Sequence, residues 1–153
     1  MMSEQYLEVL RRLYDAFHRR DMPAMLEIFD PEVEVSAPEG FQYAATMMRL
    51  LGPRFVVLLE TYHGHDEVRR LYEAMWAISA RFTVDPKEFV QRGNQVFVPV
   101  VLRAQTAEGG IEGEAEGAHL WTLAGERVKS LRVYSDRRRA LAAISPVEGD
   151  TEE

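Results

Sequence analysis

Two short stretches near the carboxyl end carry the side chains best suited to acid/base chemistry. His119 and Trp121 stand two positions apart, so on a β-strand their side chains share one face. Arg132, Tyr134 and Asp136 have the same spacing and would share one face of the following strand. If these faces line a cavity, that cavity holds one carboxylate, one imidazole and two aromatic side chains.

Asp136 is the first candidate for a catalytic residue, and His119 is the second. A carboxylate in an apolar cavity loses the solvation of its charged form, so its pKa rises toward the range useful to a general acid or base. An imidazole can orient a substrate, polarise a carbonyl or carry a second proton. A hairpin turn at residues 124–125 would place His119 roughly opposite Arg132. The set predicts proton abstraction next to a carbonyl group.

Each of these candidates also has a structural interpretation. Asp136 immediately precedes a predicted short helix, and aspartate is among the best N-cap residues, so it could cap that helix and pair with Arg137 or Arg139. His119 could be a hydrogen-bonded histidine of the core beside Trp121. The sequence leaves both interpretations of Asp136 open, a cavity acid or a helix cap.

A cluster of metal-ligand residue types occurs at His63, His65 and Asp66. Two histidines two positions apart across a glycine could share one ion, but they would need further ligands. The chain has no cysteine, and His18 and His119 have no partner at ligand spacing. A loop that enters a helix is the favoured interpretation, and no metal site is predicted.

Acidic residues alternate along one predicted strand, at Glu112, Glu114 and Glu116. Acids with a period of two usually mark the wet side of a half-buried strand, although a sheet edge or a subunit surface would show the same pattern. Arg103 on the neighbouring strand could pair with them. The opposite face carries two glycines that leave room for a neighbour or a ligand, Gly113 and Gly117.

Apolar periodicity divides the chain into helices and strands. Steps of three and four residues predict helices, and alternation predicts half-buried strands. Asp21 is predicted to cap the second helix, whose first turn contains Pro23. The predicted helices span residues 4–20, 22–29, 66–80 and 136–144, and the predicted strands span residues 32–37, 82–91, 95–106, 111–123 and 127–135.

An apolar insert at residues 41–59 interrupts this order. Its first part, Phe41 to Leu51, could form a helix that is closed by Gly52-Pro53. Phe55 to Leu59 could be a short strand or a continuation of the apolar segment, because periodicity does not separate the two. The insert could act as a lid, as extra dimer surface, as a helix that lines an enlarged cavity, or as packing.

The composition is that of a soluble globular protein of 153 residues, 46% hydrophobic and 28% charged. The net charge is −7, and an acidic body lacks the basic face that nucleic-acid binding requires. Residues 1–144 are expected to form a single domain, and the acidic residues 145–153 a disordered tail. Cysteine is absent, the N-terminal residues are charged throughout, and no apolar run could span a membrane, so we expect a cytoplasmic protein.

Four segments of the chain carry a family resemblance, and their order agrees with the predicted elements. They are Leu13-Tyr14-Asp15-Ala16-Phe17 with Arg20-Asp21, Tyr62 to Val68, Ala118 to Leu123, and Val128 to Asp136. Over about residues 5–144 the chain resembles the SnoaL-like branch of the nuclear transport factor two superfamily. Ketosteroid isomerases and polyketide cyclases share this superfamily.

The resemblance implies an α+β fold, a cone-shaped barrel of curved mixed or antiparallel sheet capped by three N-terminal helices, with a short C-terminal helix. It also implies a homodimer packed through the outer sheet face, and a cavity that binds a small hydrophobic molecule without a cofactor. In the family's cyclases an aspartate at the end of the last strand acts as acid and base, a role that carries over to Asp136 and less directly to His119. The expected substrate-binding residues are Tyr14, Phe17, Trp121, Arg132 and Tyr134.

The resemblance leaves more than one function open. The first is a cofactor-independent isomerase or cyclase that does acid/base chemistry on a small hydrophobic carbonyl compound. The alternative is a non-catalytic ligand-binding or dimerisation module of the same fold. A hydrolase like the epoxide hydrolases of the superfamily would use Asp136 as one acid and Arg103 or Arg132 as the cation, but no second acid is evident on the right face.

Overall fold

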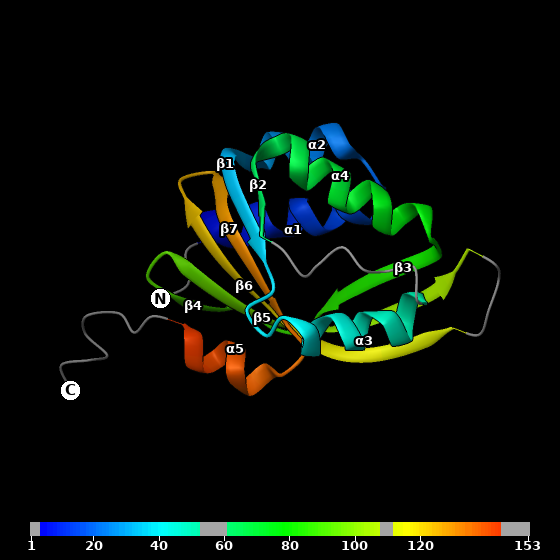
Figure 1. The fold of residues 1–153 in the computed structure, drawn as a ribbon. Helices are drawn as coiled ribbons and strands as arrows, with labels where there is room; N and C mark the ends of the chain where they lie inside the picture. The colour runs from blue at the N-terminus through cyan, green and yellow to red at the C-terminus, as the bar shows by residue number, and fades with distance from the viewer. Residues whose placement is uncertain (1–3, 53–60, 108–111, 145–153) are drawn as a thin grey trace.

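The computed structural model describes residues 4–52, 61–107 and 112–144, which contain five helices and seven strands (Figure 1). The helices are α1 (Glu4–His18), α2 (Met22–Ile28), α3 (Phe41–Leu51), α4 (Gly64–Ala77) and α5 (Arg137–Ala143). The strands are β1 (Phe29–Ser36), β2 (Tyr62–His63), β3 (Ser79–Pro86), β4 (Val90–Arg92), β5 (Gln95–Thr106), β6 (Gly113–Ala124) and β7 (Arg127–Tyr134).

The strands form one curved sheet in the order β2-β1-β7-β6-β5-β3, with β4 also paired to β5. β1 runs parallel to β7, whereas the other pairs are antiparallel, so the sheet is mixed. The sheet is not closed, because β2 and β3 lie at opposite ends of this order. The α+β fold class expected from the resemblance is therefore confirmed.

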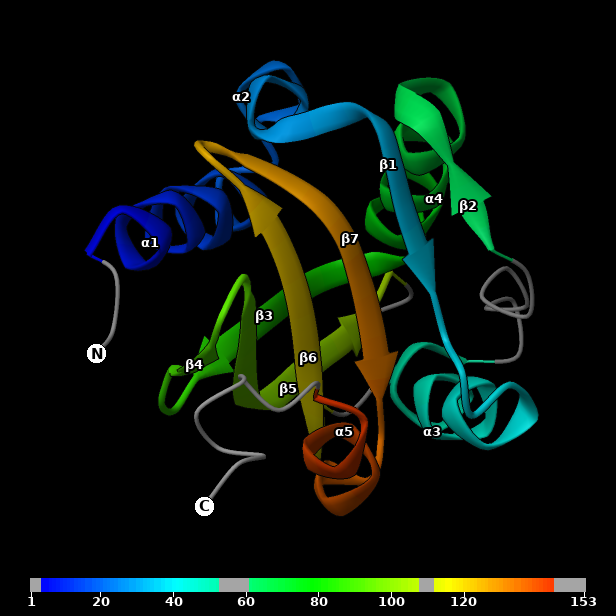
Figure 2. The same cartoon turned by 90° about the vertical axis from the view of Figure 1, so that its left-hand side faces the viewer.

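Helices α1, α2 and α4 lie on the concave side of the sheet, and α5 lies on the other side (Figures 1 and 2). The amphipathic pattern explains this layering, because the apolar side of each helix is buried against the inward residues of the strands. The core contains Leu10, Leu13 and Leu71 from the helices, and Val33 and Leu123 from the strands. None of the helices in the described residues has both the length and the apolar character needed to cross a membrane.

Local signals set the boundaries of the second helix as predicted. Asp21 is the N-cap of α2, and its Oδ1 accepts a hydrogen bond from Ala24 N at 3.2 Å. Arg20, just before it, has a left-handed backbone with φ of 53°. Its guanidinium donates to the carbonyl oxygens of Trp76 and Ser79, both at 3.1 Å, and thereby holds the end of α1 against the end of α4.

One predicted strand, over residues 82–91, is two strands in the structure. β3 and β4 pair with different halves of β5. β3 ends at Pro86, which has no N–H to donate to a ladder. Lys87 N still donates to Pro99 O at 2.8 Å, and β4 begins at Val90.

The first part of the apolar insert is helix α3, with the bounds expected from the sequence. It packs on the concave side at the far ends of β5 and β6. Gly113 permits this approach, because a Cβ atom built there would lie only 3.1 Å from Leu50 Cδ2. The predicted room for a neighbour at Gly113 is thus taken by α3, while residues 55–59 lie outside the described residues.

The outer face of the sheet has an apolar part and a charged part. Ala140 of α5 and Ile144, the residue that follows this helix, are buried against Phe97, Leu120 and Tyr134. Elsewhere Arg103 Nε donates to Glu114 Oε1 at 3.1 Å, as the sequence suggested. Glu112, just before β6, and Glu114 and Glu116 within it are exposed, as both the solvated face and the subunit surface predict. The homodimer expected through this face stays a prediction, and the tail at 145–153 lies outside the described residues.

Candidate functional site

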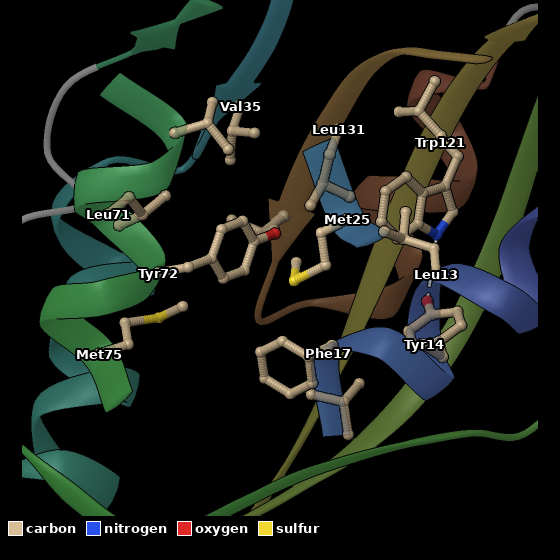
Figure 3. Close-up of a cluster of buried hydrophobic side chains, with 14 of the residues drawn as sticks. Leu13, Tyr14, Phe17, Met25, Val35, Leu71, Tyr72, Met75, Trp121 and Leu131 are labelled. Atoms are coloured by element: carbon tan, nitrogen blue, oxygen red, sulfur yellow. Dashed lines mark hydrogen bonds between the residues drawn. The ribbon is translucent and has the colours of Figure 1, made fainter. Parts of the chain in front are cut away.

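A buried cavity of about 50 Å³ lies between the concave face of the sheet and the helices. Its volume is several times the ~10–15 Å³ that one water requires, and far below the roughly 300–1,000 Å³ of common ligand pockets. The wall is mostly apolar, and the side chains from α1, α4 and the strands converge on it (Figure 3). The cavity therefore suits a small occupant.

Three aromatic side chains form a hydrogen-bonded cluster in this wall, which we call the Tyr14 cluster (Tyr14, His119 and Trp121). Trp121 Nε1 donates to the Tyr14 hydroxyl oxygen at 3.1 Å, and this oxygen lies 2.7 Å from His119 Nδ1. The Tyr14 and His119 rings are nearly parallel, at 8°, and the Trp121 ring stands at 87° and 88° to them. The three rings thus fix one another.

The His119 imidazole is neutral and its protonation can be assigned. Burial lowers its pKa from 6.5 to about 3. The Tyr14 hydroxyl accepts from Trp121 and keeps its own proton, because burial raises the pKa of Tyr14. That proton is donated to His119 Nδ1, so the imidazole proton resides on Nε2. Within the described residues no hydrogen bond to Nε2 is formed, and this N–H is available to a ligand.

The hairpin register differs from the expected one, and this corrects the placement of Arg132 and Tyr134. β6 pairs with β7 through Leu120 opposite Arg132 and His119 opposite Val133. Because side chains alternate, a shift of one residue moves a whole strand to the other face. Arg132 and Tyr134 therefore lie on the outer face, and the predicted placement of these two side chains in the cavity is wrong.

The cavity wall receives the other side chains of β7 instead, Leu131 and Val133. An irregularity between Thr122 and Leu123 produces the shift, since the pairing nearer the turn has a different offset. Tyr134 is buried under α5, against Leu120.

Asp136 lies at the start of α5, outside the cavity. Its Oδ1 accepts from Arg138 N at 2.9 Å, which is the geometry of an N-cap. The Glu39 carboxylate directs this turn, because it accepts from Ser135 N at 2.7 Å and from Asp136 N at 3.0 Å. Of the two interpretations the structure has the helix cap, and the placement of Asp136 as an acid inside the cavity is wrong.

Replacing Asp136 should change stability and leave the cavity intact. Asp136→Ala removes the cap of α5, and we expect a loss of about 1 kcal/mol in the free energy of unfolding. Asp136→Asn keeps a capping oxygen and should stay within a few tenths of wild type. Urea unfolding of the two variants measures this difference, and an equal loss in both would contradict the cap.

The three histidines outside the cavity each have a separate partner. His65 Nε2 donates to the carbonyl of Phe29 at 2.8 Å, and His63 Nε2 lies 3.3 Å from Glu32 Oε1. His18 Nε2 accepts from Val84 N at 3.0 Å. Across residues 4–52, 61–107 and 112–144, no group of three or more His, Asp or Glu side chains is placed to share a metal ion.

The cavity brings together four of the residues that the sequence singled out, Tyr14, Phe17, His119 and Trp121. Sequence reasoning missed two further phenols, Tyr43 of α3 and Tyr72 of α4. Tyr72 falls on the apolar stripe of its helix, and this was the signal that could have placed it inside. For Tyr43 the signal was the apolar insert, for which a cavity-lining helix was one of the interpretations.

The mixed, curved sheet with helices on its concave side defines the nuclear transport factor two-like class. In this class, a solved protein of unknown function from Burkholderia pseudomallei is 26% identical with a TM-score of 0.68, over 94% of this chain and 99% of that chain. A hypothetical protein from Catenulispora acidiphila with a ketosteroid isomerase-like fold, solved in complex with trimethylamine, is 15% identical with a TM-score of 0.67, over 88% of this chain and 90% of that chain. A Sinorhizobium meliloti protein provisionally identified as a polyketide cyclase is 17% identical with a TM-score of 0.60, over 82% and 93%.

The family follows from the sequence itself. The family model of the SnoaL-like domain matches residues 10–131, and the chain belongs to this family. A search of the curated proteins found no match.

Proposed function

We propose that this protein binds a small, neutral, mostly apolar carbonyl compound in its cavity, with His119 Nε2 as the hydrogen-bond donor to the carbonyl oxygen. The observation that carries the proposal is the Tyr14 cluster. It presents a neutral imidazole whose Nδ1 is occupied and whose Nε2–H remains available in an apolar wall. A donor in such a wall orients a ligand and selects an acceptor.

The same cavity is poorly equipped to abstract a proton. No carboxylate is among the described residues that line it. His119, with a pKa of about 3, lies four units below neutral pH, whereas an efficient general base has a pKa near the working pH. Four units correspond to about 5 kcal/mol of lost basicity. Binding is therefore favoured over an isomerase or cyclase that depends on a side-chain base.

A second candidate function rests on the neutral state of His119. A neutral imidazole can polarise a carbonyl, which is the role of the neutral histidine in triosephosphate isomerase. The protein would then stabilise the enolate oxygen of a bound carbonyl through the His119 Nε2–H, while a hydroxide or water from solvent takes the proton from the neighbouring carbon. Incorporation of solvent deuterium into cyclohexanone beyond the rate without protein, lost in His119→Phe, would support this candidate.

Binding of cyclohexanone tests the proposal against methylenecyclohexane, a hydrocarbon of the same shape. The cavity of about 50 Å³ has to widen to admit a ring of this size, and the three methionines of its wall are the flexible side chains that would move. We expect His119→Phe to weaken cyclohexanone binding about fivefold and to leave the hydrocarbon unchanged, because one hydrogen bond is lost. Amide chemical shifts would give both dissociation constants.

The control for this experiment is Asp136→Asn, which lies outside the cavity and should bind both probes as wild type does. A wild-type protein that binds neither probe, or a His119→Phe variant with undiminished affinity for the ketone, would sink the proposal.

A further inference from the structure

Two phenol hydroxyls in the cavity wall are not used by the Tyr14 cluster. Tyr43 and Tyr72 both line the cavity and are 5% and 7% exposed. Within the part of the chain that the structure describes, neither hydroxyl has a hydrogen-bond partner. Among the fully enclosed side-chain nitrogen and oxygen atoms of the described residues, only Trp76 Nε1 lacks a partner, so the two phenol hydroxyls are accessible rather than sealed in the core. Phenylalanine would fill the same space without a hydroxyl that needs a partner.

The two phenols lie on other elements than His119. The Tyr72 side chain extends from α4 toward the opposite wall, where Tyr14 and Trp121 lie (Figure 3). Tyr43 comes from α3, whereas His119 is on β6. A charge on the Tyr72 oxygen would raise the pKa of both Tyr14 and Tyr43, so this oxygen lies within electrostatic reach of each.

The Tyr72 ring is held in place before any ligand arrives. It stacks on the Phe29 ring, with 6.1 Å between the ring centroids and 19° between the ring planes. It meets the Phe17 ring edge-on, with 5.9 Å between the centroids and 70° between the planes. The Trp76 ring contacts it as well, at 6.1 Å. A hydroxyl on a ring so constrained is preorganised, which reduces the entropy lost on binding.

We propose that Tyr43 and Tyr72 form a second polar subsite, so that the cavity selects a neutral molecule with one oxygen group for His119 Nε2 and another for the phenols. A diketone or a hydroxyketone with its oxygens at opposite ends has this chemistry. The inference rests on the proposed function for its first oxygen. A neutral ligand is specified because no charged side chain is among the described residues of the wall.

The test compares cyclohexane-1,4-dione with cyclohexanone, two probes of the same ring size. In wild type we expect the dione to bind about fivefold more tightly, the effect of roughly one hydrogen bond. In Tyr43→Phe/Tyr72→Phe this preference should disappear, whereas Asp136→Asn, which lies outside the cavity, should keep it. An equal preference in wild type and variant would overturn the subsite, because the phenols would then contact only water.

Stability supplies a second, independent readout. Phenols without protein partners predict that Tyr43→Phe and Tyr72→Phe, each alone, melt no lower than wild type. Melting as far below wild type as Tyr14→Phe would show structural partners and overturn the proposal.

The two proposals fail in different ways. A wild-type protein that does not bind cyclohexanone counts against the proposed function, whereas a wild-type protein that binds cyclohexanone without preferring the dione counts against this subsite. If wild type binds neither probe, both proposals fall.

Discussion

Lowering the pH from 7.5 to 5 should cost the native state about 2 kcal/mol through His119 alone. Burial lowers the pKa of this imidazole from 6.5 to about 3, so between these values the unfolded chain binds a proton that the native state does not. Stability therefore rises with pH in this window and is lost as the pH falls. At pH 4 the loss should reach about 3 kcal/mol.

Urea unfolding of wild type and His119→Gln at pH 7.5, 6 and 5 measures how much of the pH dependence of the unfolding free energy comes from His119. Glutamine has no titrating group, and every carboxylate is shared by the two proteins, so their contributions cancel in the comparison. The stability of wild type should fall by about 2 kcal/mol more than that of the variant. Parallel curves would mean that His119 is solvated or charged in the native state.

Tyr14→Phe should destabilise the protein by about 2 to 4 kcal/mol, a large effect for the removal of one oxygen atom. The hydroxyl serves two buried partners at once, accepting from Trp121 Nε1 at 3.1 Å and donating to His119 Nδ1 at 2.7 Å. Without it a buried donor and a buried acceptor are both left unpaired, and each costs about 1–3 kcal/mol.

Tyr72→Phe is the matched control for this variant, because it makes the same chemical change in the same cavity. Its hydroxyl has no partner within the described residues, so the free energy of unfolding should not fall. Chemical unfolding at pH 7.5 gives both values, and an equal loss in the two variants would contradict the role assigned to the Tyr14 hydroxyl.

Features that depend on neighbours in the chain could be predicted from the sequence. The bounds of α3 and the cap at Asp21 follow from local apolar spacing and hydrogen bonding, and the structure has both. His119 and Trp121 share a face because they are two residues apart on one strand. The family resemblance agreed with these local signals, and the family is confirmed.

Features that depend on pairing across the chain could not be predicted in the same way. The irregularity near Thr122 changes the offset of β6 against β7, and no residue type at that position predicts it. That one step decided whether Tyr134 or Val133 entered the cavity. Asp136 depended in turn on Glu39, whose carboxylate reaches it from the loop before α3.

The Tyr14 cluster joins residues 105 positions apart, and the parallel pairing of β1 with β7 joins Val35 to Leu131. Closing such loops is cheap at equilibrium, because each doubling of loop length adds only about 0.6 kcal/mol. It slows folding, because the chain loses entropy before the contacts between distant residues form and stabilise it. The cavity is thus a property of the completed fold: neither the helical half of the chain nor the strand-rich half contains it alone.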